Sequence, residues 1–160
     1  MRLPKPVKRE AKAARPPRRA KRLRKRRRGK QATLGRMADK LWGQIVRHAG
    51  RCERCGATDR IQGAHGISRR YRATRWLTLN GFALCSGCHV TMTHDPLAWD
   101  DYLRKAWGPD VYDTFRRMAQ KQAKPDLEAI VESLRCELFK LEGLPPRAES
   151  VRQGGMCQKN

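Results

Sequence analysis

The sequence predicts an α+β fold: a small strand–loop–strand–helix unit flanked by helices, with a disordered basic arm before it. Two short apolar runs separated by a polar loop lie near the middle of the chain. Segments with apolar residues at spacings of three and four lie on both sides, and two Cys-x-x-Cys pairs bracket the two runs. A chain of 160 residues has room for one compact domain with extensions.

Residues 1–32 are predicted to form the disordered basic arm. Residues 1–30 hold 16 of the 37 Lys and Arg residues, one acidic residue, four prolines and almost nothing apolar to bury. The whole chain has a net charge of +22, which favours a polyanionic partner because basic side chains at phosphates release counterions. The arm could also be a solubilising tail or a nuclear or nucleolar address.

No stretch of the chain is apolar enough to predict a membrane span, and the arm lacks the apolar segment of a secretory signal. Six cysteines without such a signal indicate a reducing compartment and metal ligation rather than disulfides. We therefore expect a cytoplasmic protein with no membrane partner.

Residues 33–142 are expected to form the folded domain, beginning with a helix that ends at Gly50. Its apolar residues recur at helical spacing: Leu34, Met37, Leu41 and Ile45. The segments RIQGAH (residues 60–65) and GFALC (residues 81–85) predict two short strands. The segment SGCHVTMTHD then opens a helix directly after the second strand.

Three further helices are expected, because Pro96, Pro109 and Pro125 each open a helical pattern. The last pattern has an amphipathic stripe that would pack on the domain or on a partner helix. The oligomeric state, monomer or homodimer, stays open. Residues 143–160 are expected to be a flexible tail.

The two cysteine pairs predict one shared structural Zn²⁺. Cys-x-x-Cys lets two thiolates from one tight turn reach one ion, and a tetrahedral zinc takes four such ligands. The four candidates are Cys52, Cys55, Cys85 and Cys88. Since metal binding contributes to the free energy of folding, the site would stabilise a small domain with few aromatic residues.

Three residues near the cysteines suggest chemistry beyond structural zinc. His65 closes the first predicted strand, Asn80 precedes the second, and His89 follows the last cysteine. In a strand–loop–strand–helix unit, this order places the two histidines across from each other, with Asn80 bracing the loop between them. A histidine can deprotonate water near neutral pH, and a divalent metal can stabilise charge on a phosphate. One or both histidines could instead be zinc ligands or packed polar residues.

The segments AH, N and LCSGCH in this order resemble the signature of the HNH (His-Me finger) endonucleases, in the zinc-braced form with two cysteine pairs. The wider run CERCGATDRIQGAHGISRRYRATRW resembles the NinG (Rap) recombination endonucleases of lambda-type phages. The resemblance covers residues 41–120 and leaves out the arm and the last forty residues. It implies a zinc-braced ββα core.

By this resemblance, His65 would be the general base, Asn80 would fix the active loop, and His89 would bind a catalytic Mg²⁺ or another divalent cation. Many HNH enzymes carry a second metal ligand just before the base, where this chain has Ala64. His94 or Asp95 could replace that ligand, although neither lies at a spacing from His89 that gives a clean shared helix face.

The loop after the first strand, GISRRYRATRW, is rich in arginine. Guanidinium groups bind phosphates in a fixed orientation, and the interleaved Tyr71 and Trp76 could stack on bases. The candidate nucleic-acid-binding residues are Arg69, Arg70, Arg72 and Arg75. The loop could instead be a solvated turn.

The sequence therefore leads us to expect a metal-dependent DNA endonuclease, with DNA, possibly branched, as its partner. A role in phage or prophage recombination, in the cytoplasm of the bacterial host, follows from the resemblance alone. The alternative is a zinc-ribbon module that binds nucleic acid without cutting it. A basic protein associated with RNA or the ribosome is a third possibility, supported only by the arm.

Overall fold

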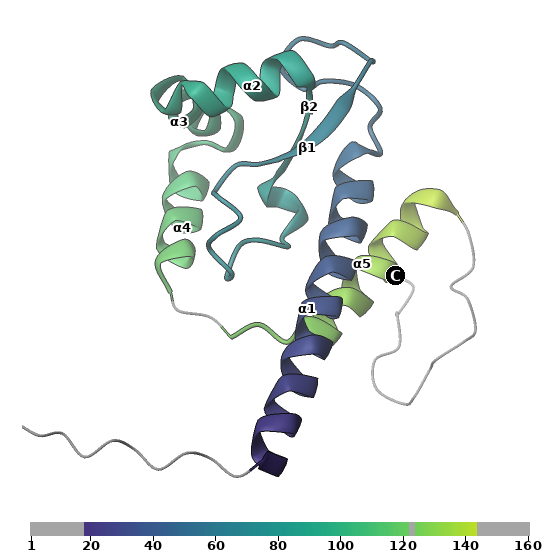
Figure 1. Ribbon diagram of the computed structural model, residues 1–160. Coiled ribbons are helices and arrows are strands. Elements are labelled where there is room, and N and C mark those ends of the chain that lie inside the picture. Colours follow the sequence, from purple (N-terminus) through teal and green to yellow (C-terminus); the bar gives the residue numbers. More distant parts are fainter. Residues whose placement is uncertain (1–17, 122–123, 144–160) are drawn as a thin grey trace, which may run out of the picture.

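The computed structural model describes residues 18–121 and 124–143, which form five helices and a two-stranded antiparallel sheet (Figure 1). The elements follow the chain as α1 (Arg18–Arg47), β1 (Ile61–His65), the 3₁₀ turn η1 (Thr78–Asn80), β2 (Gly81–Cys85), α2 (Ser86–His94), α3 (Pro96–Trp107), α4 (Pro109–Gln120) and α5 (Leu127–Glu142). The mixed helix and sheet class predicted from the sequence is confirmed. The predicted tail after residue 143 lies outside the described residues.

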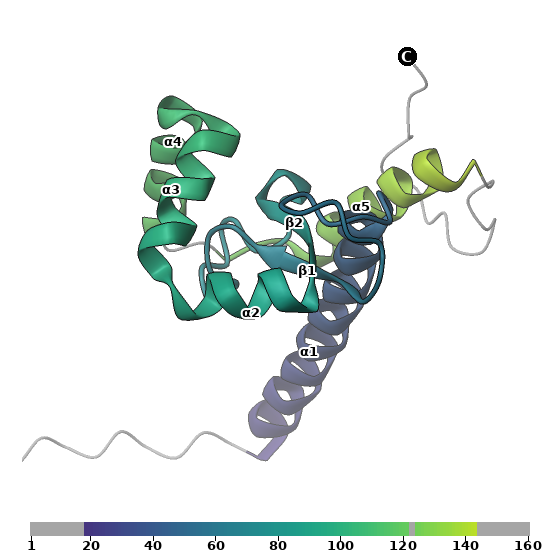
Figure 2. The same ribbon diagram turned by 90° about the horizontal axis from the view of Figure 1, so that it is seen from above.

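The β1–β2 hairpin lies between α1 on one face and α2 to α4 on the other (Figures 1 and 2). Its strands pair in a register that sets Ile61 opposite Cys85 and His65 opposite Gly81. The candidate metal ligands and the candidate base therefore lie at opposite ends of the hairpin, with the cysteines at one end and His65 at the other.

Glycines on the α1 face let this helix approach the hairpin backbone. A Cβ added at Gly63 would lie 3.2 Å from Cζ3 of Trp42, and one added at Gly81 would lie 2.2 Å from Cγ2 of Val46. On the opposite face, Phe82 contacts the aromatic side chains of α3. The hairpin is thus held by close helix–backbone packing on one side and by side-chain packing on the other.

Two hydrophobic clusters hold the helices in place. One joins the hairpin to α3 and α4 and includes Leu84, Leu103 and Tyr112. The other joins α1 to α5 and includes Ala38, Trp42, Ile45, Leu127, Val131 and Leu134. The amphipathic stripe predicted for the last helix therefore packs on α1 of the same chain.

The prediction of a disordered arm through residue 32 is wrong for residues 18–32, which belong to α1. Arg, Lys, Ala and Leu are strong helix formers, and no proline follows Pro17 until well beyond this helix. Once residues 34–47 are packed as a helix, each preceding residue adds one hydrogen bond without a new nucleation step. Residues 1–17 lie outside the described residues.

The predicted helix starts at Pro96 and Pro109 agree with the structure, whereas the last helix begins at Leu127, two residues after Pro125, and the first ends at Arg47, before Gly50. Oδ1 of Asp95 accepts a hydrogen bond from the Ala98 N–H at 3.0 Å at the start of α3. Oδ1 of Asp126 caps α5 in the same way, and Gly143 ends that helix with a φ of 65°. In the described ranges, no helix is long and apolar enough to cross a bilayer.

Candidate metal centre and histidine pocket

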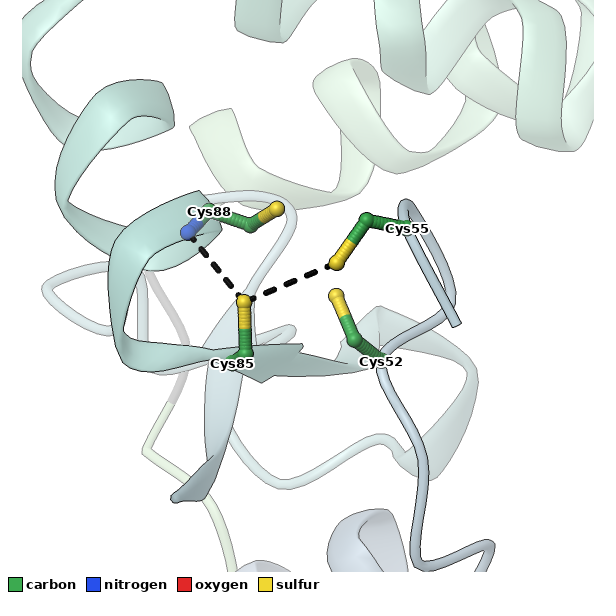
Figure 3. A group of neighbouring side chains, drawn as sticks. All are labelled: Cys52, Cys55, Cys85 and Cys88. Atoms are coloured by element: carbon green, nitrogen blue, oxygen red, sulfur yellow. Dashed lines mark hydrogen bonds between the residues drawn. The ribbon is translucent and has the colours of Figure 1, made fainter. Parts of the chain in front are cut away.

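Four cysteine sulfurs converge at one end of the hairpin (Figure 3). The Sγ atoms of Cys52, Cys55, Cys85 and Cys88 all lie within 4.8 Å of one another, and Cys55 and Cys85 are 3.7 Å apart. A tetrahedral ion with Zn–S bonds of about 2.3 Å sets its sulfur ligands about 3.8 Å apart. The cluster could therefore bind a metal such as zinc.

Each cysteine pair is shaped by its own backbone. Cys52 accepts a hydrogen bond from Gly56 N–H at 2.8 Å, in a turn that Gly56 closes with a φ of 77°. Cys85 is the N-cap of α2, and its Sγ accepts from the Cys88 N–H at 3.5 Å. The order turn–hairpin–helix brings the two pairs together.

Glu53 attaches the first cysteine turn to the free edge of β2. Its N–H donates to the Ala83 carbonyl at 2.8 Å, and its carboxylate accepts from the Ala83 N–H at 2.6 Å. The free edge of the hairpin is covered at this point.

The thiols differ in acidity. Burial raises the pKa of Cys52, but hydrogen bonds from backbone N–H groups outweigh burial and bring it to about 6. Burial raises the pKa of Cys88, and hydrogen bonds with the neighbouring thiols raise it further, to about 12. Four thiolates this close would repel one another strongly, so the fully ionised cluster requires a cation.

His65 lies at the opposite end of β1, held on two sides. Its ring stacks on Trp42 of α1, with ring centroids 3.8 Å apart and an interplanar angle of 14°. Its Nε2 lies 3.0 Å from the backbone carbonyl oxygen of Arg75. A carbonyl oxygen can only accept, so Nε2 carries the proton and the neutral ring keeps its lone pair on Nδ1.

The surroundings of His65 favour that neutral form. Burial lowers the pKa of the imidazole below 6.5 and outweighs the hydrogen bond to Arg75, which raises the pKa. At neutral pH the ring is therefore a proton acceptor at Nδ1.

Asn80 is fully buried and connects the two ends of the loop between the strands. Its Oδ1 accepts from the Ile67 N–H at 2.6 Å. Its Nδ2 donates to the Ile67 and Thr74 carbonyl oxygens, both at 3.0 Å. These three hydrogen bonds fix the path of the loop that follows His65.

His89 and His65 line the same open pocket, which has a volume of about 490 Å³. His89 projects from α2, and its Nδ1 lies 2.7 Å from the Gln62 amide oxygen, so Nδ1 is protonated and Nε2 keeps the lone pair. Neither histidine belongs to the cysteine cluster. The pocket wall also includes Ala64, Ser68, Arg69, Met92, Thr93 and Trp99.

None of the described residues that line the pocket is an aspartate or a glutamate, and this wall includes neither His94 nor Asp95. His94 is exposed, and the Asp95 carboxylate caps α3. Among the described residues, the cysteine cluster is the one group of three or more side chains arranged to hold a metal. The described wall of the pocket offers two imidazoles, His65 and His89, as nitrogen donors.

The four loop arginines are placed differently from one another. Arg69 is exposed at the pocket wall, and Arg72 lines a separate pocket between the loop and α5. Arg70 is exposed and donates to the Tyr71 hydroxyl at 2.6 Å. Arg75 instead binds the Asp39 carboxylate through Nε at 3.0 Å and Nη2 at 2.6 Å, so it attaches the loop to α1.

Sequence reasoning missed the residues that hold the pocket in shape. Asp39 accepts hydrogen bonds from both Arg75 and the Trp76 indole, the latter at 2.8 Å. Trp42 donates to the Leu77 carbonyl at 3.1 Å while it supports the His65 ring. No sequence signal identifies Asp39, because its partners lie more than thirty positions away.

Comparison of the chain with models of protein families, with curated proteins and with solved structures finds no match.

Proposed function

We propose that this protein is a metal-dependent HNH-type endonuclease that hydrolyses DNA phosphodiester bonds. The observation that carries the proposal is the state of His65, a neutral imidazole whose Nε2 donates to a backbone carbonyl and whose Nδ1 can accept a proton. His65 is among the residues that line the open pocket, and a base with a depressed pKa is suited to deprotonate water. The resemblance of AH, N and LCSGCH to the HNH signature gives this base its reaction.

In this mechanism, His65 Nδ1 takes a proton from water, and the resulting hydroxide attacks the phosphorus of the phosphodiester. The P–O bond to the leaving ester oxygen breaks, and that oxygen takes a proton from solvent. Trp42 and the Arg75 carbonyl fix the ring, so it needs little reorganisation before it accepts the proton. Asn80 holds the loop so that Arg69 stays at the pocket wall, where its guanidinium can bind a phosphate oxygen.

Two metals enter the proposal in different ways. A structural Zn²⁺ would be held by Cys52, Cys55, Cys85 and Cys88, whose number, chemistry and spacing suit a tetrahedral ion. A catalytic Mg²⁺ or similar cation would have the free Nε2 of His89 as its protein ligand and would take its remaining ligands from phosphate and water. Such a cation supplies charge stabilisation at the phosphate. This protein ligand set is incomplete without the nucleic acid.

The test is cleavage of linear, branched and single-stranded DNA by the full chain, with and without Mg²⁺ or Mn²⁺. We expect products only with metal, and a loss of about a hundredfold or more in rate for His65→Ala. His94→Ala is the matched control, because His94 is an exposed histidine outside the pocket. Full activity of His65→Ala, with metal content and DNA affinity unchanged, would remove the proposed base.

A second candidate function is a zinc-ribbon module that binds nucleic acid without cutting it. The lack of a carboxylate in the histidine pocket favours this candidate, because common catalytic sites for Mg²⁺ include one or two. DNA binding by intact protein, with no products on any of these substrates in either metal, would select it.

A further inference from the structure

The first turns of α1 extend past the rest of the fold. The α5 helix begins beside the middle of α1, where Lys30 pairs with Glu128 at 2.5 Å and Gly35 lies against Leu127. The part of α1 before Lys30 continues away from the other elements (Figures 1 and 2). Every side chain from 22 to 30 is exposed.

This basic segment, residues 22–29, is positively charged around its whole circumference. Six of its eight residues are basic: Arg22, Arg24, Lys25, Arg26, Arg27 and Arg28. None of the six forms an ion pair with a described residue, and no acidic residue occurs between positions 11 and 38. Since like charges three and four residues apart repel on a helix, this segment gains stability from a bound polyanion.

The distribution of apolar residues excludes a membrane surface as the favoured partner. A helix that lies in a lipid headgroup layer needs one apolar face. In this segment the single large apolar side chain is Leu23, which is 58% exposed. A charged helix without an apolar face suits a partner that surrounds it with phosphates.

The shape of the segment selects the kind of nucleic acid. An α-helix with its side chains is about 10–12 Å wide, and the major groove of B-form DNA is about 12 Å wide. The major groove of A-form RNA is too narrow and deep to admit side chains in this way. A protruding, continuous basic helix therefore fits the DNA groove.

We propose that residues 22–29 of α1 bind in the major groove of duplex DNA, as a second contact beside the histidine pocket. This inference rests on the proposed function, because it assumes that the histidine pocket binds the same duplex. Arg26 precedes Trp42 by sixteen residues, or about 24 Å along the helix axis, and Trp42 stacks on His65. If α1 runs along the duplex axis, at about 3.4 Å per base pair, this separation corresponds to roughly seven base pairs between the groove contact and the level of Trp42.

The experiment measures the affinity of the full chain for four duplexes of one sequence. They are unmodified DNA, DNA whose major groove carries glucosylated hydroxymethylcytosine, DNA saturated with a minor-groove ligand, and RNA. We expect glucosylation to weaken binding by about tenfold or more, since several phosphate contacts are lost together. The minor-groove ligand should have little effect, and the RNA should bind more weakly than DNA.

The key variant is Ala32→Pro, which breaks α1 between the basic segment and the packed part of the helix without changing any charge. Proline removes the N–H of residue 32 and clashes with the Arg28 carbonyl. This variant should bind plain and glucosylated DNA equally, whereas the control Ala32→Ser, at the same exposed position, should keep the discrimination. Replacing Arg24, Arg26, Arg27 and Arg28 by Gln should lower the salt slope by about 0.9 per lost phosphate contact.

Three results would overturn the inference. They are equal affinity for RNA and DNA, binding that is weakened by the minor-groove ligand instead of by glucosylation, and an Ala32→Pro variant that still prefers plain to glucosylated DNA. Preference of the chain for anionic phosphatidylserine vesicles over DNA would do so too. If the chain cleaves DNA but binds plain and glucosylated DNA equally, the proposed function stands and this inference fails. Groove-dependent binding without cleavage would remove the enzyme and keep the groove contact.

Discussion

Replacing Asp39 by Ala should destabilise the domain and loosen the loop that holds His65. The Asp39 carboxylate accepts two hydrogen bonds from Arg75 and one from the Trp76 indole. The Arg75 carbonyl, in turn, accepts from Nε2 of His65. One carboxylate on α1 thus fixes the residue that sets the protonation of the candidate base.

The magnitude follows from these three bonds. Hydrogen bonds to charged groups contribute about 1.5–3 kcal/mol each when buried, and a neutral one about 1 kcal/mol. The Asp39 and Arg75 side chains are 38% and 25% exposed, so screening by solvent reduces the contribution of each of the three bonds to about 1 kcal/mol. We expect Asp39→Ala to lower the free energy of unfolding by about 2–4 kcal/mol. Asp39→Asn keeps one hydrogen-bond acceptor, so it should lower the free energy of unfolding by about half as much as Asp39→Ala.

The assay is equilibrium unfolding in urea under reducing conditions with metal present. Asp59→Asn is the control, because the Asp59–Arg60 pair joins adjacent residues that are 68% and 79% exposed, and its loss should change stability by less than about 0.5 kcal/mol. If Asp39→Asn and Asp59→Asn were equally stable, the anchoring role of Asp39 would be refuted.

Three other changes have expected outcomes. A Cβ at Gly66 would lie 2.4 Å from Cη2 of Trp107, so Gly66→Ala should lower the free energy of unfolding in urea by about 1–3 kcal/mol. Gly87→Ala is the control, because a Cβ there meets no atom within 4 Å and should leave the free energy of unfolding unchanged. If the cysteine cluster binds zinc as we propose, Cys55→Ser, which removes one of four converging ligands, or chelation of the wild type should lower both the metal content measured by elemental analysis and the melting temperature. Burial lowers the pKa of His65, so the rate of DNA cleavage should stay level through neutral pH and fall only below 6.5. By linkage, stability should also fall with acid below 6.5, because the unfolded chain binds this proton first. A cleavage rate that halves above pH 7 would contradict the first expectation, and an unfolding free energy that does not change below pH 6.5 would contradict the second.

The sequence was most informative where a local rule decides the structure. Pro96, which follows Asp95, and Pro109 marked helix starts through capping and proline geometry, which need no tertiary information, and Pro125 lies just before the Asp126 cap of α5. The cysteine spacing indicated the metal cluster because two tight turns can share one ion. The boundaries of β1 and β2 followed from short apolar runs.

The sequence was least informative where charge or distant contacts decide. The basic composition of residues 18–32 suggested disorder, yet their helix propensity and the packed helix that follows them extend α1. In the sequence, Arg75 cannot be distinguished from the other loop arginines, because its partner Asp39 lies on a distant part of the chain. The stacking of Trp42 on His65 joins two elements whose contact no periodicity predicts.

The glycines that face α1 have a consequence for how this hairpin can vary. The Trp42 and Val46 side chains of α1 occupy the space that side chains at positions 63 and 81 would otherwise fill. A larger residue on the strand would have to be matched by a smaller one on the helix. At Gly81, Val46→Ala would remove the contact at 2.2 Å, but an added Cβ would still lie 3.0 Å from Cζ2 of Trp42 and 3.1 Å from the Thr78 carbonyl oxygen. Trp42 is the worst position for such an exchange, since trimming its indole would also withdraw the surface on which the imidazole rests.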